Sequence, residues 1–271
     1  MISSDRRARM LLSYAMEGGD LAVAELVQNL GAEGAWAKII EGVLGAPAAE
    51  RAGRIRIDVV ERLAKTTATR FIIPGSDEWP AGLDDLRHAE SVQRRGGEPV
   101  GLWLRGPGHL AHLMERSVAI VGSRAATAYG SGIATDLAAD LVEQGVTVLS
   151  GGAFGIDVAA HRGALTAGGP TVSVLANGVD VAYPPGHAIA FRRLGQGAAI
   201  GLRAAAWGSS HAGAVPGPQP ADRRDVTRHG GGGGGATLRR TQHSKLGAGL
   251  RTPRLWRFRV RCTPGPRRPR T

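Results

Sequence analysis

Three short apolar runs, each followed by a glycine-containing turn, constrain the fold of this chain most strongly. The runs lie at residues 118–121, 146–149 and 172–175 and are rich in valine, which favours strands. The segments between them, around 130–144 and 156–167, carry apolar residues at helical spacing. A strand–helix–strand–helix–strand series with right-handed crossovers predicts a parallel sheet with helices on both faces. The fold class is therefore α/β with a Rossmann-like sheet.

Two further apolar runs, at 71–73 and 100–104, precede this series, so we predict a Rossmann-like domain over residues 69–190. Residues 5–65 differ, because their apolar side chains recur at helical spacing and glycines at 18–19 and 31–34 interrupt the pattern. The sequence predicts a small helical domain over residues 1–68, of the helix-hairpin-helix or SAM-like type. Such bundles can contact DNA backbones or proteins, and a role only in packing or dimer formation is equally open.

The positive charge of the chain is not spread evenly. The chain has 34 Lys and Arg, 23 Asp and Glu and a net charge of +11, but residues 188–271 hold 17 of the basic and 2 of the acidic residues. Residues 1–187 therefore hold 17 basic and 21 acidic residues, a net charge of −4. The bulk charge thus gives no evidence that the foldable part binds nucleic acid.

Other compositional features exclude several classes of site. Cys262 is the single cysteine, so the chain has neither an internal disulfide nor a cysteine-based metal site. No apolar run approaches the roughly 20 residues of a membrane span, and the first residues lack the apolar core of a secretory signal. We therefore expect a protein of the cytoplasm, without a membrane partner.

The first strand of the series ends in a turn suited to phosphate. Gly122, Ser123 and Arg124 follow the apolar run, and the next helix is predicted to start near Tyr129 and Gly130. Free backbone N–H groups and a helix N-terminus favour an anion, a hydroxyl can donate to it, and a guanidinium can bind two phosphate oxygens. The turn matches neither the dinucleotide-binding glycine pattern nor the P-loop. Tight-turn packing explains the same residues equally well.

The second and third strands end at the same edge of the predicted sheet, where ligands bind in such folds. Asp157 and His161 are four residues apart, so they share a helix face, and the simplest interpretation is that Asp157 is an N-cap and His161 its partner. No nucleophile accompanies this pair in the sequence, so it does not indicate catalysis. The candidate residues after these two strands are Gly151, Gly152, Phe154, Gly155, Asp157, His161, Asn177 and Gly178.

The strings SVAIVGSRAATAYG, VLSGGAFGIDVAAHRGAL and TVSVLANGVDVAYPPGH, in this order and spacing, resemble the DNA-processing protein A (DprA/Smf) family. The resemblance covers about residues 70–187. It implies a Rossmann-like protein, often dimeric, that binds single-stranded DNA and loads the RecA recombinase during natural transformation, without catalysis, cofactor or metal.

By the same resemblance, DNA would be bound at the carboxyl edge of the sheet. Gly122, Ser123 and Arg124 would hold a DNA phosphate, and the loop from Gly151 to Asp157 would line the same groove. Many relatives have arginine at the position of Phe154 in this chain. The phenylalanine lacks the phosphate contact that the arginine would make, but its ring could stack on a base. The full set of DNA-binding candidates is Gly122, Ser123, Arg124, Tyr129, Gly151, Gly152, Phe154, Gly155, Asp157, His161, Asn177 and Gly178.

Residues 191–271 are rich in Gly, Arg and Pro, with a six-glycine run at 230–235, and predict a disordered tail. The family continues with segments like LLLSE-x-PPG, RNR, VVVEA and SGAL, which are absent here. When the codons that could encode residues 198–243 are read one base out of step, they permit the segments LLLVSELPPG, RFLVRNRLIAA, GTVVVEAA and SGALNT. These segments stand in the order of the family. We interpret the tail as read out of frame after about residue 190, rather than as an authentic low-complexity tail.

A lost frame has structural and functional consequences. The Rossmann-like sheet would be incomplete, apolar strand surface would be exposed, and residues 195–271 would hold little regular structure. We therefore expect a chain impaired in DNA handling. Two alternatives remain: a Rossmann-like nucleotide-binding enzyme of the phosphoribohydrolase type, whose P-G-G-x-G-T loop is missing here, and an acidic structural domain without a ligand.

Overall fold

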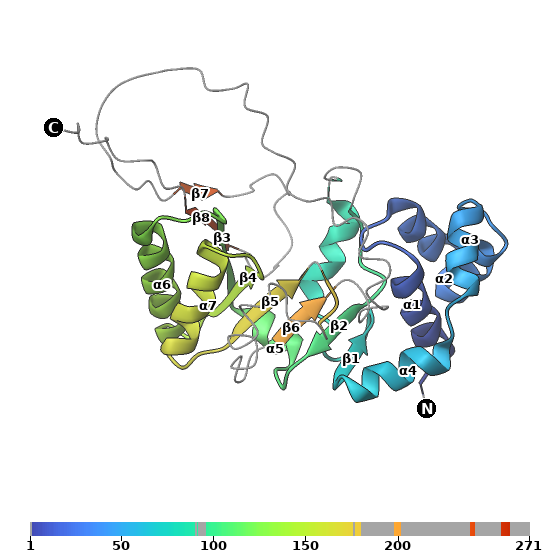
Figure 1. Ribbon diagram of the computed structural model, residues 1–271, viewed down its shortest axis with the longest axis horizontal. Coiled ribbons are helices and arrows are strands. Elements are labelled where there is room, and N and C mark those ends of the chain that lie inside the picture. Colours follow the sequence, from blue (N-terminus) through green and yellow to red (C-terminus); the bar gives the residue numbers. More distant parts are fainter. Residues whose placement is uncertain are drawn as a thin grey trace, which may run out of the picture.

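The computed structural model describes residues 2–89, 91, 96–175, 177–179, 198–201, 239–241 and 256–260, the last three segments by their backbone alone. The N-terminal part holds four helices (Figure 1): α1 (Ser4–Ala15), α2 (Leu21–Ile40), α3 (Ala46–Gly53) and α4 (Ile57–Thr66). Ser3 caps α1 by accepting the Arg6 N–H, and Asp20 caps α2 by accepting the Ala22 and Val23 N–H groups.

The predicted glycine interruptions are confirmed in the helical part. Gly31 has φ +70 and divides α2 by a kink, and the residues at 18–19 lie between α1 and α2. The helices enclose an apolar cluster that includes Leu12, Val23 and Ile39. Burial of such side chains stabilises the bundle by roughly 1.5–3 kcal/mol each. This is the predicted small helical unit, and its assignment to the helix-hairpin-helix or SAM-like type stays a prediction.

The rest of the described chain forms one mixed sheet, in the order β1-β2-β6-β5-β4-β3-β8-β7. The strands are β1 (Thr69–Ile72), β2 (Leu102–Arg105), β3 (Ser117–Gly122), β4 (Thr147–Gly151), β5 (Thr171–Leu175), β6 (Ala198–Gly201), β7 (Arg239–Thr241) and β8 (Trp256–Val260). Pairing is parallel from β8 through β3, β4 and β5 to β6, and antiparallel for β1 with β2, β2 with β6 and β7 with β8. The α/β fold class and all five predicted strand runs are confirmed.

Two crossover helices, α6 (Ala128–Glu143) and α7 (Ile156–Thr166), pack together beside β3 and β4 (Figure 1). Their close contact depends on Gly163, since a Cβ there would lie 2.1 Å from the Thr135 carbonyl oxygen. Val118, Ile120 and Val148 contribute to the core under these helices. Alternate residues Leu149 and Val172 lie in a second cluster on the other face, with the short helix α5 (Leu110–Glu115) and the 3-10 segment Ala81–His88 contributing Leu110 and Leu83. The central strands are thus covered on both faces, as the continuous apolar runs predicted.

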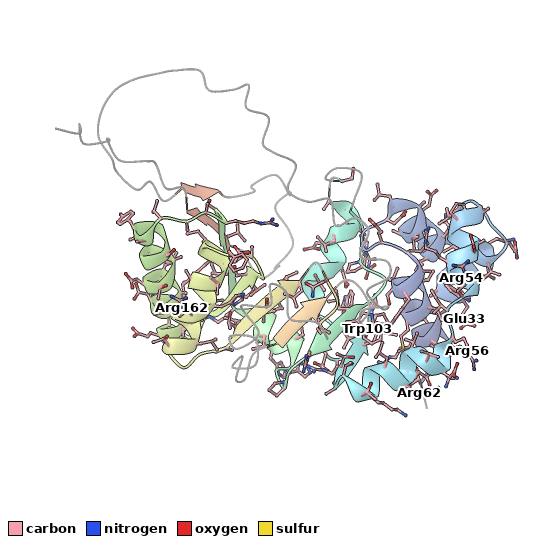
Figure 2. The ribbon with its side chains drawn as sticks, viewed as in Figure 1. Glu33, Arg54, Arg56, Arg62, Trp103 and Arg162 are labelled. Atoms are coloured by element: carbon pink, nitrogen blue, oxygen red, sulfur yellow. The ribbon has the colours of Figure 1, made fainter. Side chains whose placement is uncertain are left out.

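A third cluster joins the helical part to the sheet. Trp103 on β2 is fully buried, and its Nε1 donates to the Ser13 hydroxyl of α1 at 3.0 Å. Its ring lies edge-on to Tyr14, with centroids 5.9 Å apart, and 4.9 Å from Phe71. Figure 2 shows Trp103 between the strands and the helices of the N-terminal part. The domain boundary at residue 68 stays a prediction, but the two parts share this core.

Three strands come from the part of the chain for which we expected little regular structure. β6 fills the space between β2 and β5, and β8 pairs with β3. These three short strands are the regular structure described within residues 195–271, in keeping with the expectation of little regular structure. The other residues of 191–271, the six-glycine run included, lie outside the described part. Within the described part, none of the helices has the length and apolar character needed to cross a bilayer.

Candidate nucleic-acid interface

The turns after β3 and β4 lie in contact at one edge of the sheet. The Ile156 N–H donates to the Ser123 carbonyl oxygen at 3.2 Å. Gly155 has φ +80, and a Cβ on it would lie 2.2 Å from the Ser123 oxygen and 2.6 Å from the Arg124 oxygen. Only glycine combines this backbone conformation with this approach. The two glycine-rich turns therefore form one continuous surface.

The turn after β3 presents donors to solvent. Ser123 and Arg124 are both exposed, and the Ser123 hydroxyl accepts the Ala125 N–H at 3.2 Å, so its own proton can still be donated outward. Thr127 caps α6 by accepting the Gly130 N–H at 3.1 Å. The first turn of α6 has no acidic residue, so the dipole of this 16-residue helix adds to the charge of Arg124. This end of the surface favours an anion.

Asp157 has a different role from the predicted N-cap. The cap of α7 is Gly155, and Asp157 lies in the first turn, buried to 8% exposure. The backbone N–H groups of Ala153 and Gly122 lie near its carboxylate. Burial raises the pKa of Asp157, while these two N–H groups and the charge of Arg124 act in the opposite direction.

Gly122 has a packing role in this arrangement. Its N–H lies near the Asp157 carboxylate, and its contact with a DNA phosphate stays a prediction. Its lack of a side chain is required, because a Cβ would lie 2.6 Å from Cγ1 of Ile156. Gly151 is constrained likewise, with a Cβ 2.5 Å from an Asp157 carboxylate oxygen. These glycines permit the packing that places Ser123 and Arg124.

His161 is part of the core. Its side chain is 4% exposed, with Nδ1 2.7 Å from the Thr171 hydroxyl and Nε2 2.9 Å from the Gly151 carbonyl oxygen. The Thr171 hydroxyl in turn donates to the Val148 carbonyl oxygen at 2.7 Å. These bonds join α7 to β4 and β5, and the expected contact of His161 with Asp157 stays a prediction. Sequence spacing could not indicate Thr171, because it becomes a neighbour only through strand pairing.

The part of the chain that forms this edge of the sheet is similar to known proteins. The family model described as DNA recombination-mediator protein A matches residues 70–202, which include all three strand–turn segments. A putative DNA processing protein DprA of Mycobacterium tuberculosis is 38% identical over 236 residues, covering 84% of this chain and 58% of the relative. Residues 70–202 belong to the DprA family.

Other DprA relatives agree with this assignment. Protein Smf of Escherichia coli is 39% identical over 103 residues, which are 38% of this chain and 27% of that protein. The crystal structure of DprA from Streptococcus pneumoniae aligns with a TM-score of 0.54 and 27% identity, over 75% of this chain and 68% of that one. The chain spans only 58% of the length of the mycobacterial DprA.

The remaining predicted residues lie at the same edge of the sheet, and their side chains differ in exposure. Tyr129, in the first turn of α6, is 61% exposed and Phe154, in the turn before α7, is 53% exposed. Gly152 is half-buried. After β5, Asn177 is half-buried with its side-chain amide donating to the carbonyl oxygen of the buried Gly178 at 2.9 Å.

One residue of this edge was missed. Thr127 orders the start of α6, and a threonine just before a helix is a recognised capping signal that the sequence carries.

Proposed function

We propose that this chain binds single-stranded DNA along the surface formed by the turns after β3 and β4. The observation that supports it most is the pairing of exposed Ser123 and Arg124 with the uncharged first turn of α6, on a turn held rigid by Gly155. The Arg124 guanidinium would bind one phosphate, and the Ser123 hydroxyl and Tyr129 would contact its neighbours. The proposal is for a binding protein, not an enzyme.

The cellular role rests on family membership rather than on this geometry. The matching family model is described as DNA recombination-mediator protein A, and relatives bear the name DNA processing protein DprA. We infer that the family member encoded at this locus works in the cytoplasm during natural transformation, protects incoming single strands and loads RecA onto them. It would act as a homodimer when full-length.

We further infer that the 271-residue chain performs this role poorly. The arginines expected in the RNR segment would be absent from the groove if the frame is lost near residues 188–191. An alignment over 84% of the chain necessarily runs past residue 190, so the position of any frame change has to be measured at the DNA level. Sequencing genomic DNA across codons 180–200 decides the matter, since an intact frame there would remove this inference.

The binding proposal is tested with oligo-dT of increasing length in a salt series. Arg124→Gln is expected to weaken binding several-fold and to reduce the slope of log K against log salt by about 0.7, the loss of one single-strand phosphate contact. Arg162→Gln is the matched control, because Arg162 is an exposed arginine on α7 (Figure 2), about 9 Å along the helix from its start.

The salt series also separates the basic tail, whose contribution vanishes as salt rises. Equal binding by the Arg124 and Arg162 variants at moderate salt would overturn the proposal. Weaker binding by the 271-residue chain than by a chain with the frame restored is expected from the inferred frame loss.

A further inference from the structure

The two turns of the candidate interface differ in what they offer a nucleic acid. The turn after β3 presents Arg124 and leads into a helix whose first turn has no acid. The turn after β4 leads into α7, whose first turn contains Asp157. A Cβ on Gly151 would lie 2.5 Å from an Asp157 carboxylate oxygen, so an acidic group lies directly against this turn and disfavours a phosphate there.

The second turn presents an aromatic side chain instead. Phe154 is 53% exposed. Gly155, next to it, is held against the Ser123 and Arg124 carbonyl oxygens, so the backbone that carries Phe154 is fixed relative to Arg124. An exposed phenylalanine in an ordered turn loses little entropy on binding and offers a ring face to a planar partner.

We infer that the two turns divide the work: the β3 turn with α6 holds the DNA backbone, and Phe154 stacks on a base. This inference rests on the proposed function and adds to it the part of the ligand that each turn recognises. Stacking requires a base that is not enclosed in a duplex, so the arrangement gives a physical basis for preferring single strands. It is independent of sequence, because every base has a π face.

The test compares an oligo-dT with an oligomer of the same length and charge that carries abasic sites at its internal positions. The basic tail binds both oligomers equally, so the ratio of their dissociation constants isolates the contribution of the bases. We expect the 271-residue chain to bind the intact oligomer about 5- to 140-fold more tightly, the range that stacking on one base supplies. Phe154→Ala should reduce this ratio towards one without changing the salt slope, and Phe154→Trp should keep it.

Two further variants sharpen the result. Phe154→Arg should bind more tightly than Phe154→Ala, because it replaces stacking by a phosphate contact. It should also steepen the salt slope by about 0.7 and bind the intact and abasic oligomers with equal affinity. Val43→Ala is the control, since Val43 is 57% exposed and lies after α2, in the N-terminal part of the chain.

The outcomes separate the inference from the function it rests on. Equal binding of intact and abasic oligomers, with Arg124→Gln still defective, would overturn stacking and leave the proposed function standing. Failure to bind either oligomer above the level of Arg124→Gln would overturn both.

Discussion

The carboxylate of Asp157 packs against Gly151: a Cβ on Gly151 would lie 2.5 Å from a carboxylate oxygen, so the first turn of α7 lies close to the last residue of β4. This contact places a buried ionisable group beneath the candidate interface. Its consequences can be measured through pH.

Asp157→Asn should change how stability depends on pH. Burial raises the pKa of Asp157 above its ordinary value, so the folded state binds the proton more tightly than the unfolded state. For this group alone, stability is greatest at low pH and falls as pH rises from the ordinary aspartate pKa through the raised value. Asn does not titrate, so the variant lacks this pH dependence. We expect the unfolding free energy of wild type, measured with urea, to fall relative to that of the variant as pH rises across this range. A constant difference would contradict it.

Glu78→Gln should have the opposite sign. Glu78 is bound by Arg70 through Nε and Nη2, both at 2.7 Å, and this side-chain bond lowers the pKa of Glu78. Stability from this pair is present above the ordinary glutamate pKa and is lost as pH falls through the lowered value. We expect the variant to lose about 1.5–3 kcal/mol at neutral pH and to converge on wild type in acid, as followed by urea unfolding. An equal loss at both pH values would count against the ion pair.

Gly155→Ala should destabilise far more than Gly168→Ala. Both residues have positive φ, +80 and +75, but a Cβ at Gly168 has nothing within 4 Å, whereas at Gly155 it would meet two carbonyl oxygens. We expect about 1 kcal/mol for Gly168→Ala from backbone conformation alone, and at least about 2–3 kcal/mol for Gly155→Ala. Chemical denaturation of both variants checks this. Similar losses would show that the two turns are less closely packed than described.

Ser13→Ala and Trp103→Phe should be coupled. The Trp103 Nε1 donates to the Ser13 hydroxyl, which donates to the Met10 carbonyl oxygen at 2.7 Å, in a fully buried site. Ser13→Ala leaves the indole N–H unsatisfied, at about 1–3 kcal/mol. In a double-mutant cycle the second change should cost less once the first is made, by about 0.5–3 kcal/mol. Additive losses would mean that the helical part is not tied to the sheet by this bond.

Residues 117–175 show how much of this protein is readable locally. Valine-rich runs, helical spacing and glycine-containing turns predicted β3, β4, β5, α6 and α7 near their observed bounds, because strand and helix periodicity are short-range properties. The motif strings in the same region indicated the DprA family. The turns after β3 and β4 meet at one edge of the sheet, as expected for parallel strands, and the DNA-binding role of their residues stays a prediction.

Partners across the fold were decided only by tertiary structure. Asp157 was expected to cap its own helix and instead lies buried against Gly151 at the end of β4. His161 binds Thr171, which lies ten residues further along the chain on β5. The sequence also did not predict that β6 lies between β5 and β2. The amino-acid sequence by itself determined the elements, the turns and the family. Strand order, register and burial decided which side chains stay available to a ligand, because these depend on contacts between residues that no local pattern relates.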